Sequence, residues 1–443
     1  MSHYKPYPAY KDSGVEWLGK VPEHWEVLPL RAVASVNDDE REQSTESDGS
    51  IRYIDISTVS LEEGIGEPTV IEAQDAPSRA QRKAKTGDVV ISTVRTYLRT
   101  IGQVHHNHED CIFSTGFAVI RAGSKIAPEF LYSGLLSEPL LAEIEANSKG
   151  VSYPAINASE VMLFKLPVPP KLEQVRITEV LKRETTRIDA LISKKTRFIE
   201  LLREKRQALI THAVTKGLDP NVKMKDSGVE WLGEVPEHWV VSKLKHNLRE
   251  QLSYGANEAA EQDDPENPRF IRITDLNDDG TLRSETFKSL PWDAARPYLL
   301  EDGDVLLARS GATVGKSFLY KKIMGLACYA GYLIRARFDK NKILPRYFWY
   351  ITNSSYYWDF ISGSNIQSTI QNVSGEKYGN LWIATPPLKE QERVIIGLDS
   401  VWTRIQSIID RTEKSIELLK ERRSALITAA VTGQIDLREA VDA

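Results

Sequence analysis

The most regular spacing of hydrophobic and polar positions occupies two long segments, each introduced by a Pro-Pro pair and ended by a glycine. The first covers residues 171–214, and the second runs from just after Pro387 to Gly433. Apolar residues recur at helical spacing in both, and at ~1.5 Å per residue each helix would be roughly 65 Å long. A stripe of that length is too long to bury on a small globule. We therefore expect the two helices to pack on each other, antiparallel because a folded domain separates them.

The hydrophobic seams of the two helices are built alike, down to a basic residue at 206 and at 423. In the first helix the two seam positions of the heptad are occupied by Leu181, Ile188, Lys195, Leu202 and Leu209, and by Thr185, Ile192, Ile199, Arg206 and Ala213. Adding 217 to each number gives Leu398, Ile405, Thr412, Leu419 and Leu426, and Trp402, Ile409, Ile416, Arg423 and Ala430.

The stretches at roughly 20–168 and 234–385 have a different pattern. Short runs rich in β-branched and aromatic residues begin at Arg52, Asp88, Cys111 and Asp304, and Gly, Pro and Asp turns separate them. Prolines open apolar stretches at 128 and 345, where the first turn of a helix tolerates them. Each stretch is therefore predicted to be an α+β domain with a mainly antiparallel sheet.

Two segments are nearly repeated. The sequence KDSGVEWLGKVPEHW from Lys11 returns from Lys225 with one change, and IELLREKRQALITHAVT from Ile199 returns from Ile416 with four changes. The sequences between these copies differ widely but keep almost the same length. A protein that recognises two different targets in the same geometry needs a constant frame around two variable inserts.

These patterns predict an α+β protein: two similar recognition domains separated by two long helices that form an antiparallel coiled coil. The expected boundaries are 1–168 for the first domain with frame segment 11–30, 169–217 for the central helix, 218–385 for the second domain with frame segment 225–244, 386–433 for the C-terminal helix, and 434–443 for a tail.

Charge is unevenly distributed in this chain of net charge −5. The two helical segments together carry +7, which leaves −12 for the rest, much of it in the stretches from Asn37 and from Glu258. Residues 79–99 contain six basic side chains and one acid. A polyanion would have to meet such basic patches with the acidic stretches turned away.

The cysteine count and hydropathy indicate a compartment. Only Cys111 and Cys328 occur, too few for a disulfide framework, and no apolar run approaches the ~18–20 residues of a membrane span. The N-terminal MSHYKPYPAY lacks the apolar core of a signal peptide. We expect a cytoplasmic protein.

The order of variable domain, long helix, variable domain and long helix resembles the specificity subunit of type I restriction–modification systems. The resemblance covers essentially the whole chain. It rests on WLGxVPEHW opening each half, on the Glu-Gln helix starts at 173–174 and 390–391, on the ALIT…AVT helix endings and on the Gly-Asp-Val turns.

This resemblance implies a non-catalytic subunit without cofactor or metal. Each domain would read one half of a split, asymmetric double-stranded DNA site, and the helices would set the gap between the halves. Two DNA methyltransferase subunits would dock on the repeated frame, and restriction or translocase subunits would join them. Frame segment 11–25 and its copy would close a ring near the helix ends.

Basic and polar residues after the Gly-Asp-Val strands are the first candidates for DNA contact, since such side chains bind phosphates and guanine edges. The second candidates are the polar stretches near Ser148 and Ser362. An ordinary solvated hairpin or loop is the alternative interpretation of each. With the basic run near residue 82, the candidate residues are Arg82, Lys83, Arg95, Thr96, Tyr97, Arg99, Lys149, Ser152, Tyr153, Arg309, Ser310, Thr313, Lys316, Asn365, Gln367 and Ser368.

Four tryptophans lie in the frame segments, where we expect them to pack domain against helix: Trp17, Trp25, Trp231 and Trp239.

Two stretches of sequence resemble enzyme motifs, but for each of them we favour a non-catalytic interpretation. The stretch from Ser310 to Ser317 resembles a P-loop but has serine where the first glycine is required. A group of three histidines (His105, His106, His108) and Cys111 has no counterpart in the second half and favours a solvated loop over a zinc site. The alternatives to a DNA-reading subunit are a coiled-coil scaffold that binds other proteins, which the acidic net charge favours, and then an enzyme acting alone.

Overall fold

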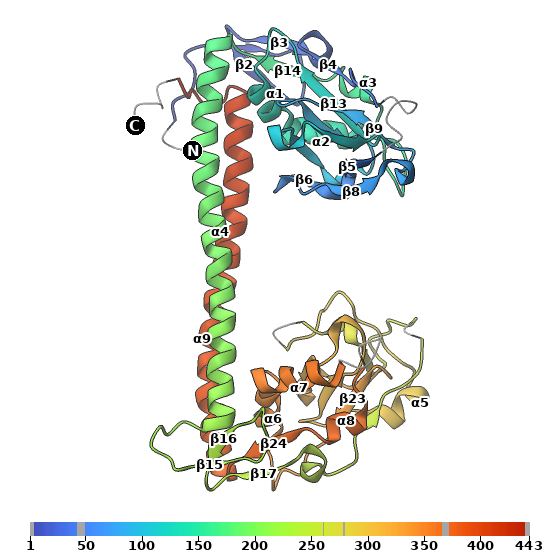
Figure 1. Ribbon diagram of the computed structural model, residues 1–443, viewed down its shortest axis with the longest axis vertical. Coiled ribbons are helices and arrows are strands. Elements are labelled where there is room, and N and C mark those ends of the chain that lie inside the picture. The colour runs from blue at the N-terminus through green and yellow to red at the C-terminus, as the bar shows by residue number, and fades with distance from the viewer. Residues whose placement is uncertain (1–3, 42–48, 260, 278–279, 366–371, 439–443) are drawn as a thin grey trace. The chain divides into compact units, whose positions relative to one another are not determined.

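The computed structural model describes residues 4–41, 49–259, 261–277, 280–365 and 372–438. The chain forms two compact units (Figure 1). Unit 1 comprises Met1–Lys195 and Glu413–Ala443, and unit 2 comprises Thr196–Thr412. Each unit contains one α+β domain together with part of each long helix.

The long helices are α4 (Lys171–Lys216) and α9 (Leu388–Val431), close to the predicted bounds. The other elements of unit 1 are β1 (Tyr10–Asp12), β2 (Lys20–Pro22), β3 (Glu26–Pro29), β4 (Ala34–Val36), β5 (Ser50–Ile54), β6 (Val59–Ser60), β7 (Gly64–Ile65), β8 (Thr69–Glu72), β9 (Ala80–Lys83), β10 (Val89–Ser92), β11 (Ile101–Gln103), β12 (Cys111–Ser114), β13 (Phe117–Ala122), α1 (Pro128–Leu135), α2 (Glu138–Ala146), α3 (Ala158–Val161) and β14 (Lys165–Val168).

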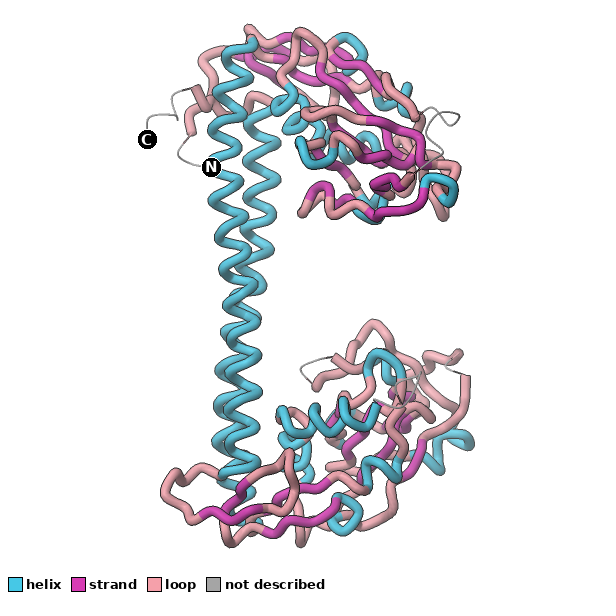
Figure 2. Tube along the Cα trace, viewed as in Figure 1, coloured by secondary structure: helices cyan, strands magenta, loops and turns pink. Residues whose placement is uncertain are grey.

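Unit 2 has a similar order of elements, with fewer strands among its described residues. Figure 2 colours the strands magenta and the helices cyan. Its elements are β15 (Met224–Asp226), β16 (Glu234–Pro236), β17 (Val240–Lys243), β18 (Ser253–Tyr254), β19 (Arg269–Ile271), α5 (Trp292–Ala295), β20 (Val305–Ala308), β21 (Ser317–Leu319), β22 (Ala327–Tyr329), β23 (Leu333–Ala336), α6 (Pro345–Ile351), α7 (Ser355–Asn365), α8 (Gly375–Gly379) and β24 (Trp382–Thr385).

Both units are built around the same antiparallel sheet. Its strand order is β11-β10-β13-β4 in unit 1 and β21-β20-β23-β18 in unit 2. One parallel pair also recurs, β5 with β12 and β19 with β22. The central strands β10 and β20 are buried along their whole length, as expected for apolar runs covered on both faces. The prediction of a mainly antiparallel α+β fold in each half is therefore confirmed.

A buried ion pair ties the central strand of each sheet to its neighbour. Arg337 donates to the two carboxylate oxygens of Asp304 at 2.8 and 2.7 Å. In unit 1, Arg121 donates to the two oxygens of Asp88 at 3.0 and 2.7 Å. These aspartates belong to the Gly-Asp-Val turns of the sequence. Hydrogen bonds to the aspartates raise the pKa of both arginines, and the guanidinium groups in turn compensate for burial of the aspartates.

The two long helices pack antiparallel within each unit. In unit 1, Arg423 of α9 pairs with Asp189 of α4 at 3.0 Å, while Leu426 lies in the same core cluster as Leu181. In unit 2, Ile210 of α4 shares a core cluster with Leu398 of α9. Residue numbers thus rise along one helix as they fall along the other, as predicted.

The heptad interpretation fails near the end of α4. Leu209, assigned to the seam, is 39% exposed, whereas Ile210 is buried at 2%. A helix of 3.6 residues per turn drifts away from a strict seven-residue repeat, so over several heptads the buried position moves by one residue. The equivalent Leu426 of α9 does lie in the core.

Glycines end both long helices in the left-handed conformation, with φ +80° at Gly217 and +74° at Gly433. A Cβ at Gly217 would lie 3.3 Å from the Trp239 ring, and one at Gly433 would lie 2.2 Å from Pro22. The end of each long helix is thus held against a frame segment. Among the helices in the described ranges, none is long and apolar enough to cross a membrane.

Candidate nucleic-acid interface

A carboxylate at the start of each long helix holds the frame segment in place. Glu173 accepts hydrogen bonds from the Trp25 indole at 3.1 Å and from the Tyr7 hydroxyl at 2.8 Å. Glu390 accepts the equivalent bond from Trp239, also at 3.1 Å. Histidines pair with the second oxygen of each carboxylate, His24 with Glu173 and His238 with Glu390.

The glutamine that follows each carboxylate binds the residues just before a short helix, α1 in unit 1 and α6 in unit 2. Gln174 donates to the carbonyls of Lys125 and Pro169 and accepts from the Ala127 amide. Gln391 makes the same three bonds, to Lys342, Pro386 and Leu344. Both side chains are fully buried. The Glu-Gln pairs are thus the joints between helix and domain, and both units use identical joints.

The frame tryptophans behave largely as predicted. Trp25 and Trp239 are buried at 0% and 1%, and Trp17 packs partly buried against the unit 1 core. Trp231 is different, because it is 46% exposed. The prediction that it packs domain against helix is therefore not confirmed for Trp231, which is not part of the unit 2 core cluster.

The two candidate segments of the first domain form one surface. Thr96 donates a 2.7 Å hydrogen bond to Ser148, and the Arg95 amide donates to the Pro154 carbonyl at 2.7 Å. Val94 and Ala155 form an isolated β-bridge. Residues 93–99 and 148–155, far apart in sequence, therefore lie side by side. Thr96 is buried in this joint and serves to hold it together.

Arg95 is the most prominent side chain of that surface. Its backbone is left-handed, with φ 51° and ψ 48°, which is uncommon for a residue with a side chain and tends to occur at functional sites. Its guanidinium lies over the Tyr153 ring at 5.0 Å. Tyr153 and Tyr97 are themselves 66% and 49% exposed, and Ser152 is exposed beside them. Exposed guanidinium and ring faces of this kind suit nucleic-acid bases and phosphates.

Other basic candidates of the first domain are paired with carboxylates. Arg99 donates to Glu138 at 2.6 Å and to Glu145 at 3.3 Å, and these bonds raise its pKa. Lys149 lies 3.4 Å from Glu160. Such partners lower the net positive charge that Arg99 and Lys149 can offer to a phosphate.

Two residues of the acidic stretch that begins at Asn37, Asp39 and Glu40, lie against the basic run. Arg82 pairs with Glu40, Lys85 lies 3.3 Å from Asp39, and Lys83 lies on the same strand, β9. Arg121 also reaches Asp39, at 2.8 Å. The expectation that acidic loops turn away from the basic patch is therefore wrong for residues 39 and 40, because these two carboxylates pair with Lys85 and Arg82.

In the second domain Arg309 occupies a different backbone position from Arg95. The Arg309 amide donates to the Tyr332 carbonyl, as the Thr93 amide donates to that of Gly116, so Arg309 corresponds to Thr93. Its guanidinium lies 4.8 Å from the centre of the Tyr254 ring, and its Nε donates to Asn372 at 3.5 Å. Both domains thus present an arginine over a tyrosine, built from different segments.

Sequence reasoning missed the partners of Arg309. Tyr254 is 42% exposed and Tyr332 61%, and both lie near the Arg309 strand end. An exposed aromatic residue after a turn is a weak signal in sequence. Only the sheet places β18 beside β23, whose other neighbour is β20, the strand that Arg309 follows. Ser310 bridges to Asn372, while the Thr313 hydroxyl is buried. Gln367 and Ser368 lie outside the described residues, as does the side chain of Asn365.

The P-loop-like stretch does not have P-loop structure. After Ser310 the chain makes a 3-10 turn at Gly311–Thr313 and continues into strand β21, where a P-loop would open a helix. Among the described residues, no group of three or more His, Cys, Asp or Glu side chains is arranged to hold a metal ion, and this includes the histidines near residue 106. His106 pairs with Glu109, and Cys111 is buried in a core cluster.

The family model for the type I restriction modification DNA specificity domain matches the chain twice, at residues 22–201 and 236–418. The chain belongs to this type I DNA specificity family. The two matches coincide with the two copies of the joint described above, so the family signature falls on both α+β domains and on most of each long helix.

Curated specificity subunits are similar to this chain over most of its length. The type I restriction enzyme StySPI specificity subunit of Salmonella potsdam is 21% identical, over 94% of this chain and 90% of its own. The EcoKI specificity subunit of Escherichia coli K12 is 22% identical over the same shares. The MjaVIII specificity subunit of Methanocaldococcus jannaschii is 25% identical over 74% of this chain and 75% of its own.

A solved chain from work on complex assembly and conformational transition of the type I R-M system has the same fold. It superimposes with a TM-score of 0.70 at 22% identity, covering 94% of this chain and 99% of that one. The chain is thus a type I restriction–modification specificity protein with two DNA specificity domains, and the predicted family is confirmed.

Proposed function

We propose that this chain is the non-catalytic recognition subunit of a type I restriction–modification complex and reads an asymmetric, split site in double-stranded DNA. Residues 1–168 would read one half and residues 218–385 the other. Residues 169–217 and 386–433 would set the gap between the halves. Methyl transfer and ATP-dependent cleavage would belong to partner subunits.

One observation carries this proposal: identical joints support different surfaces. Glu173 with Gln174, and Glu390 with Gln391, make matching bonds in the two units. The surfaces above those joints differ, with Arg95 over Tyr153 in one and Arg309 over Tyr254 in the other. A protein that reads two unlike half-sites in the same pose requires this combination.

The arginine–tyrosine pairs are the proposed reading elements. An arginine can fork onto guanine O6 and N7, and a tyrosine face beside it can contact a base or sugar. Lys316, Ser152 and Tyr97 would add contacts to phosphates. Arg99, Lys149 and Arg82 would contribute less than their charge suggests, because Glu138, Glu160 and Glu40 lie against them.

The repeated frame would also bind the partners. Two nearly identical frame segments offer two equivalent docking surfaces, which suits two copies of a DNA methyltransferase subunit. Restriction or translocase subunits would join that core in the cytoplasm. S-adenosylmethionine and ATP would then be ligands of those subunits.

DNA binding is tested by mobility shift of the full chain on random duplex, with and without the methyltransferase, over a salt series. Contacts to phosphates release counterions, so we expect affinity to fall steeply as salt rises. Binding that does not respond to salt, or no binding in either condition, would contradict the proposal and favour a protein-binding scaffold.

A further inference from the structure

The surface that carries Arg95 also exposes a group of hydrophobic side chains. Among the described residues of the first domain six large hydrophobic side chains are exposed, and four of these lie in residues 93–99 and 148–155. They are Tyr97, Leu98, Val151 and Tyr153, and we call them the apolar tip. Single exposed apolar side chains are ordinary, whereas several on one surface indicate a binding site.

The backbone turn that carries Leu98 is strained at both ends. The Leu98 amide closes the turn by donating to the Arg95 carbonyl at 2.9 Å. The backbone is left-handed at Arg95 and at Arg99, with φ 51° and 49°, a conformation that is costly for residues other than glycine. Arg99 attaches the turn to helix α2, because its guanidinium bonds Glu138 and Glu145. The turn therefore presents Leu98 in a defined position next to Arg95.

Unit 2 contains the same turn with a different surface. Its backbone has positive φ at Gly311 and Gly315, with three residues between them, as at 95 and 99 in unit 1. The Val314 amide closes the turn by donating to the Gly311 carbonyl at 3.1 Å, so Val314 corresponds to Leu98. Leu98 is 50% exposed, whereas Val314 is only 7% exposed and belongs to the core of unit 2.

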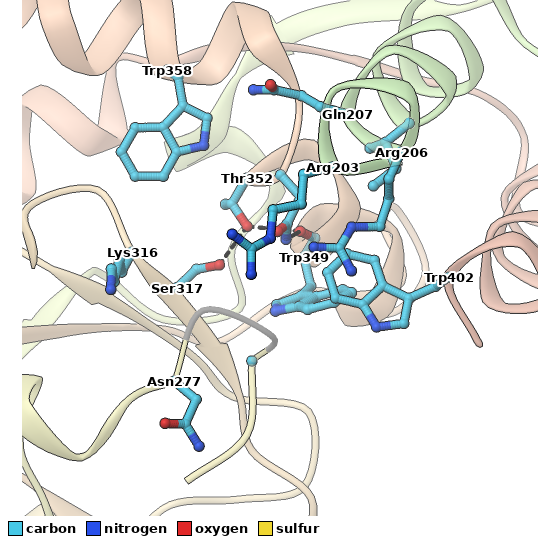
Figure 3. Close-up of a pocket in the computed structure, with 13 residues that line it drawn as sticks. Arg203, Arg206, Gln207, Asn277, Lys316, Ser317, Trp349, Thr352, Trp358 and Trp402 are labelled. Atoms are coloured by element: carbon cyan, nitrogen blue, oxygen red, sulfur yellow. Dashed lines mark hydrogen bonds between the residues drawn. The ribbon is translucent and has the colours of Figure 1, made fainter. Parts of the chain in front are cut away.

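Helix α7 covers the turn of unit 2. A Cβ at Gly315 would lie 2.9 Å from the Trp358 ring and 3.1 Å from Ile361, and both of these residues belong to α7. Just after the turn, the Ser317 hydroxyl shares a 2.6 Å hydrogen bond with that of Thr352, shortly before the same helix (Figure 3). Unit 2 thus buries the residue that the first domain exposes.

The position of the apolar tip next to Arg95 limits what it can contact on DNA. The proposed contact of Arg95 with guanine O6 and N7 takes place in the major groove. The apolar group that base edges present in that groove is the C5-methyl group of thymine. An exposed leucine three residues after the arginine matches this group in chemistry.

We propose that Leu98, with Val151 from the adjoining segment, contacts the C5-methyl group of a thymine in the half-site that residues 1–168 read. The inference rests on the proposed function and adds a base type to it. The Tyr97 hydroxyl keeps its proposed role at a phosphate. The turn of unit 2 does not make the equivalent contact, because Val314 is buried.

Replacement of thymine by uracil removes only the methyl group and so tests the contact directly. Duplexes are selected from a randomised library by the full chain with its methyltransferase, and each thymine of the selected motif is then replaced in turn. One replacement, in the part of the motif that Arg95→Ala relaxes, should lower wild-type affinity about fourfold, the factor expected for one methyl-sized group. Leu98→Ser should bind the thymine and uracil duplexes with equal affinity, and Val151→Ser should narrow the difference.

The matched control is Leu172→Ser, the same change at an exposed leucine outside the apolar tip, at the start of α4. This variant should keep the fourfold difference between the two duplexes. Circular dichroism checks that each variant folds, which we expect because all three side chains are exposed.

Three results would overturn the inference while leaving the proposed function in place. The first is that no uracil replacement lowers wild-type affinity. The second is that Leu98→Ser and Val151→Ser both keep the wild-type difference. The third is that the thymine whose effect Leu98→Ser removes lies outside the part of the motif that Arg95→Ala relaxes. Failure to select any duplex would instead contradict the proposed function, and this inference with it.

Discussion

The Trp25 indole donates a 3.1 Å hydrogen bond to Glu173, the third residue of helix α4. This contact joins the frame segment to the start of the long helix across 148 residues of sequence. Its copy, from Trp239 to Glu390, has the same length. Two identical bonds in two units with different surfaces are the structural basis for assigning one pose to both recognition domains.

Replacement of Glu173 by alanine should destabilise unit 1. The change leaves the Trp25 indole and the Tyr7 hydroxyl without their acceptor in a buried site, at about 1–3 kcal/mol for each unsatisfied donor. Hydrogen exchange measured by mass spectrometry should show faster exchange in residues 7–25 than in the wild type. Glu390→Ala is the matched control and should affect unit 2 alone, to a smaller extent, since Glu390 is more exposed.

Replacement of Asp304 by alanine should be more damaging than the equivalent change of Asp88. Arg337 is only 9% exposed, and loss of one partner from a buried ion pair costs about 3–5 kcal/mol. Both arginines keep a further carboxylate at 2.8 Å, Asp39 for Arg121 and Glu301 for Arg337, so the ranking rests on burial. The Arg121 side chain is 23% exposed and that of Arg337 is 10% exposed, so Asp88→Ala should cost less. Thermal unfolding followed by circular dichroism compares the two variants. Equal shifts would contradict this ranking.

Arg95→Ala and Arg309→Ala should each weaken recognition of one half-site. A bidentate contact between arginine and guanine contributes about 1–3 kcal/mol of discrimination, which corresponds to losses of roughly five- to 150-fold. Binding is measured on duplexes in which one half of the target or the other is scrambled. Arg99→Ala is the control within the same loop, because Glu138 and Glu145 already pair with Arg99. An equal loss of affinity at both half-sites would refute the claim that each domain reads one half-site.

A seven-residue insertion near residue 195, with a matching heptad in α9, should lengthen the gap between half-sites. Seven helical residues add ~10 Å, and at about 3.4 Å per base pair this corresponds to roughly three base pairs. Selection of bound duplexes from a library with variable gaps reports the preferred length. An insertion of the same size in the β6–β7 turn provides a control. If the gap is unchanged by the helix insertion, the helices are not the spacer.

Much of the framework could be predicted from sequence because it repeats. The Pro-Pro starts and glycine ends of both helices appear directly in the chain, and the Glu-Gln pairs mark the joints. The sequence could not show what Gln174 contacts, since its partners near residue 125 are brought to it only by folding of the domain.

The candidate surface was predictable only in part. Arg95 and Tyr153 were both identified, but their contact depends on the bridge between Val94 and Ala155. Tyr254 was missed because it precedes Arg309 by 55 residues and reaches it through the sheet. Sequence alone gave Arg82 no acidic partner, whereas the fold places Glu40 against it. Local pattern identifies residue types, whereas charge neutralisation depends on which distant segments meet.

The most direct test of the central claim is single-molecule sequencing of methylated DNA from cells that express this chain with its methyltransferase. The account predicts one motif of two short specified parts separated by a fixed number of unspecified base pairs. It also predicts that Arg95→Ala relaxes one part and Arg309→Ala the other. A single continuous motif, or relaxation of both parts by either substitution, would contradict the account.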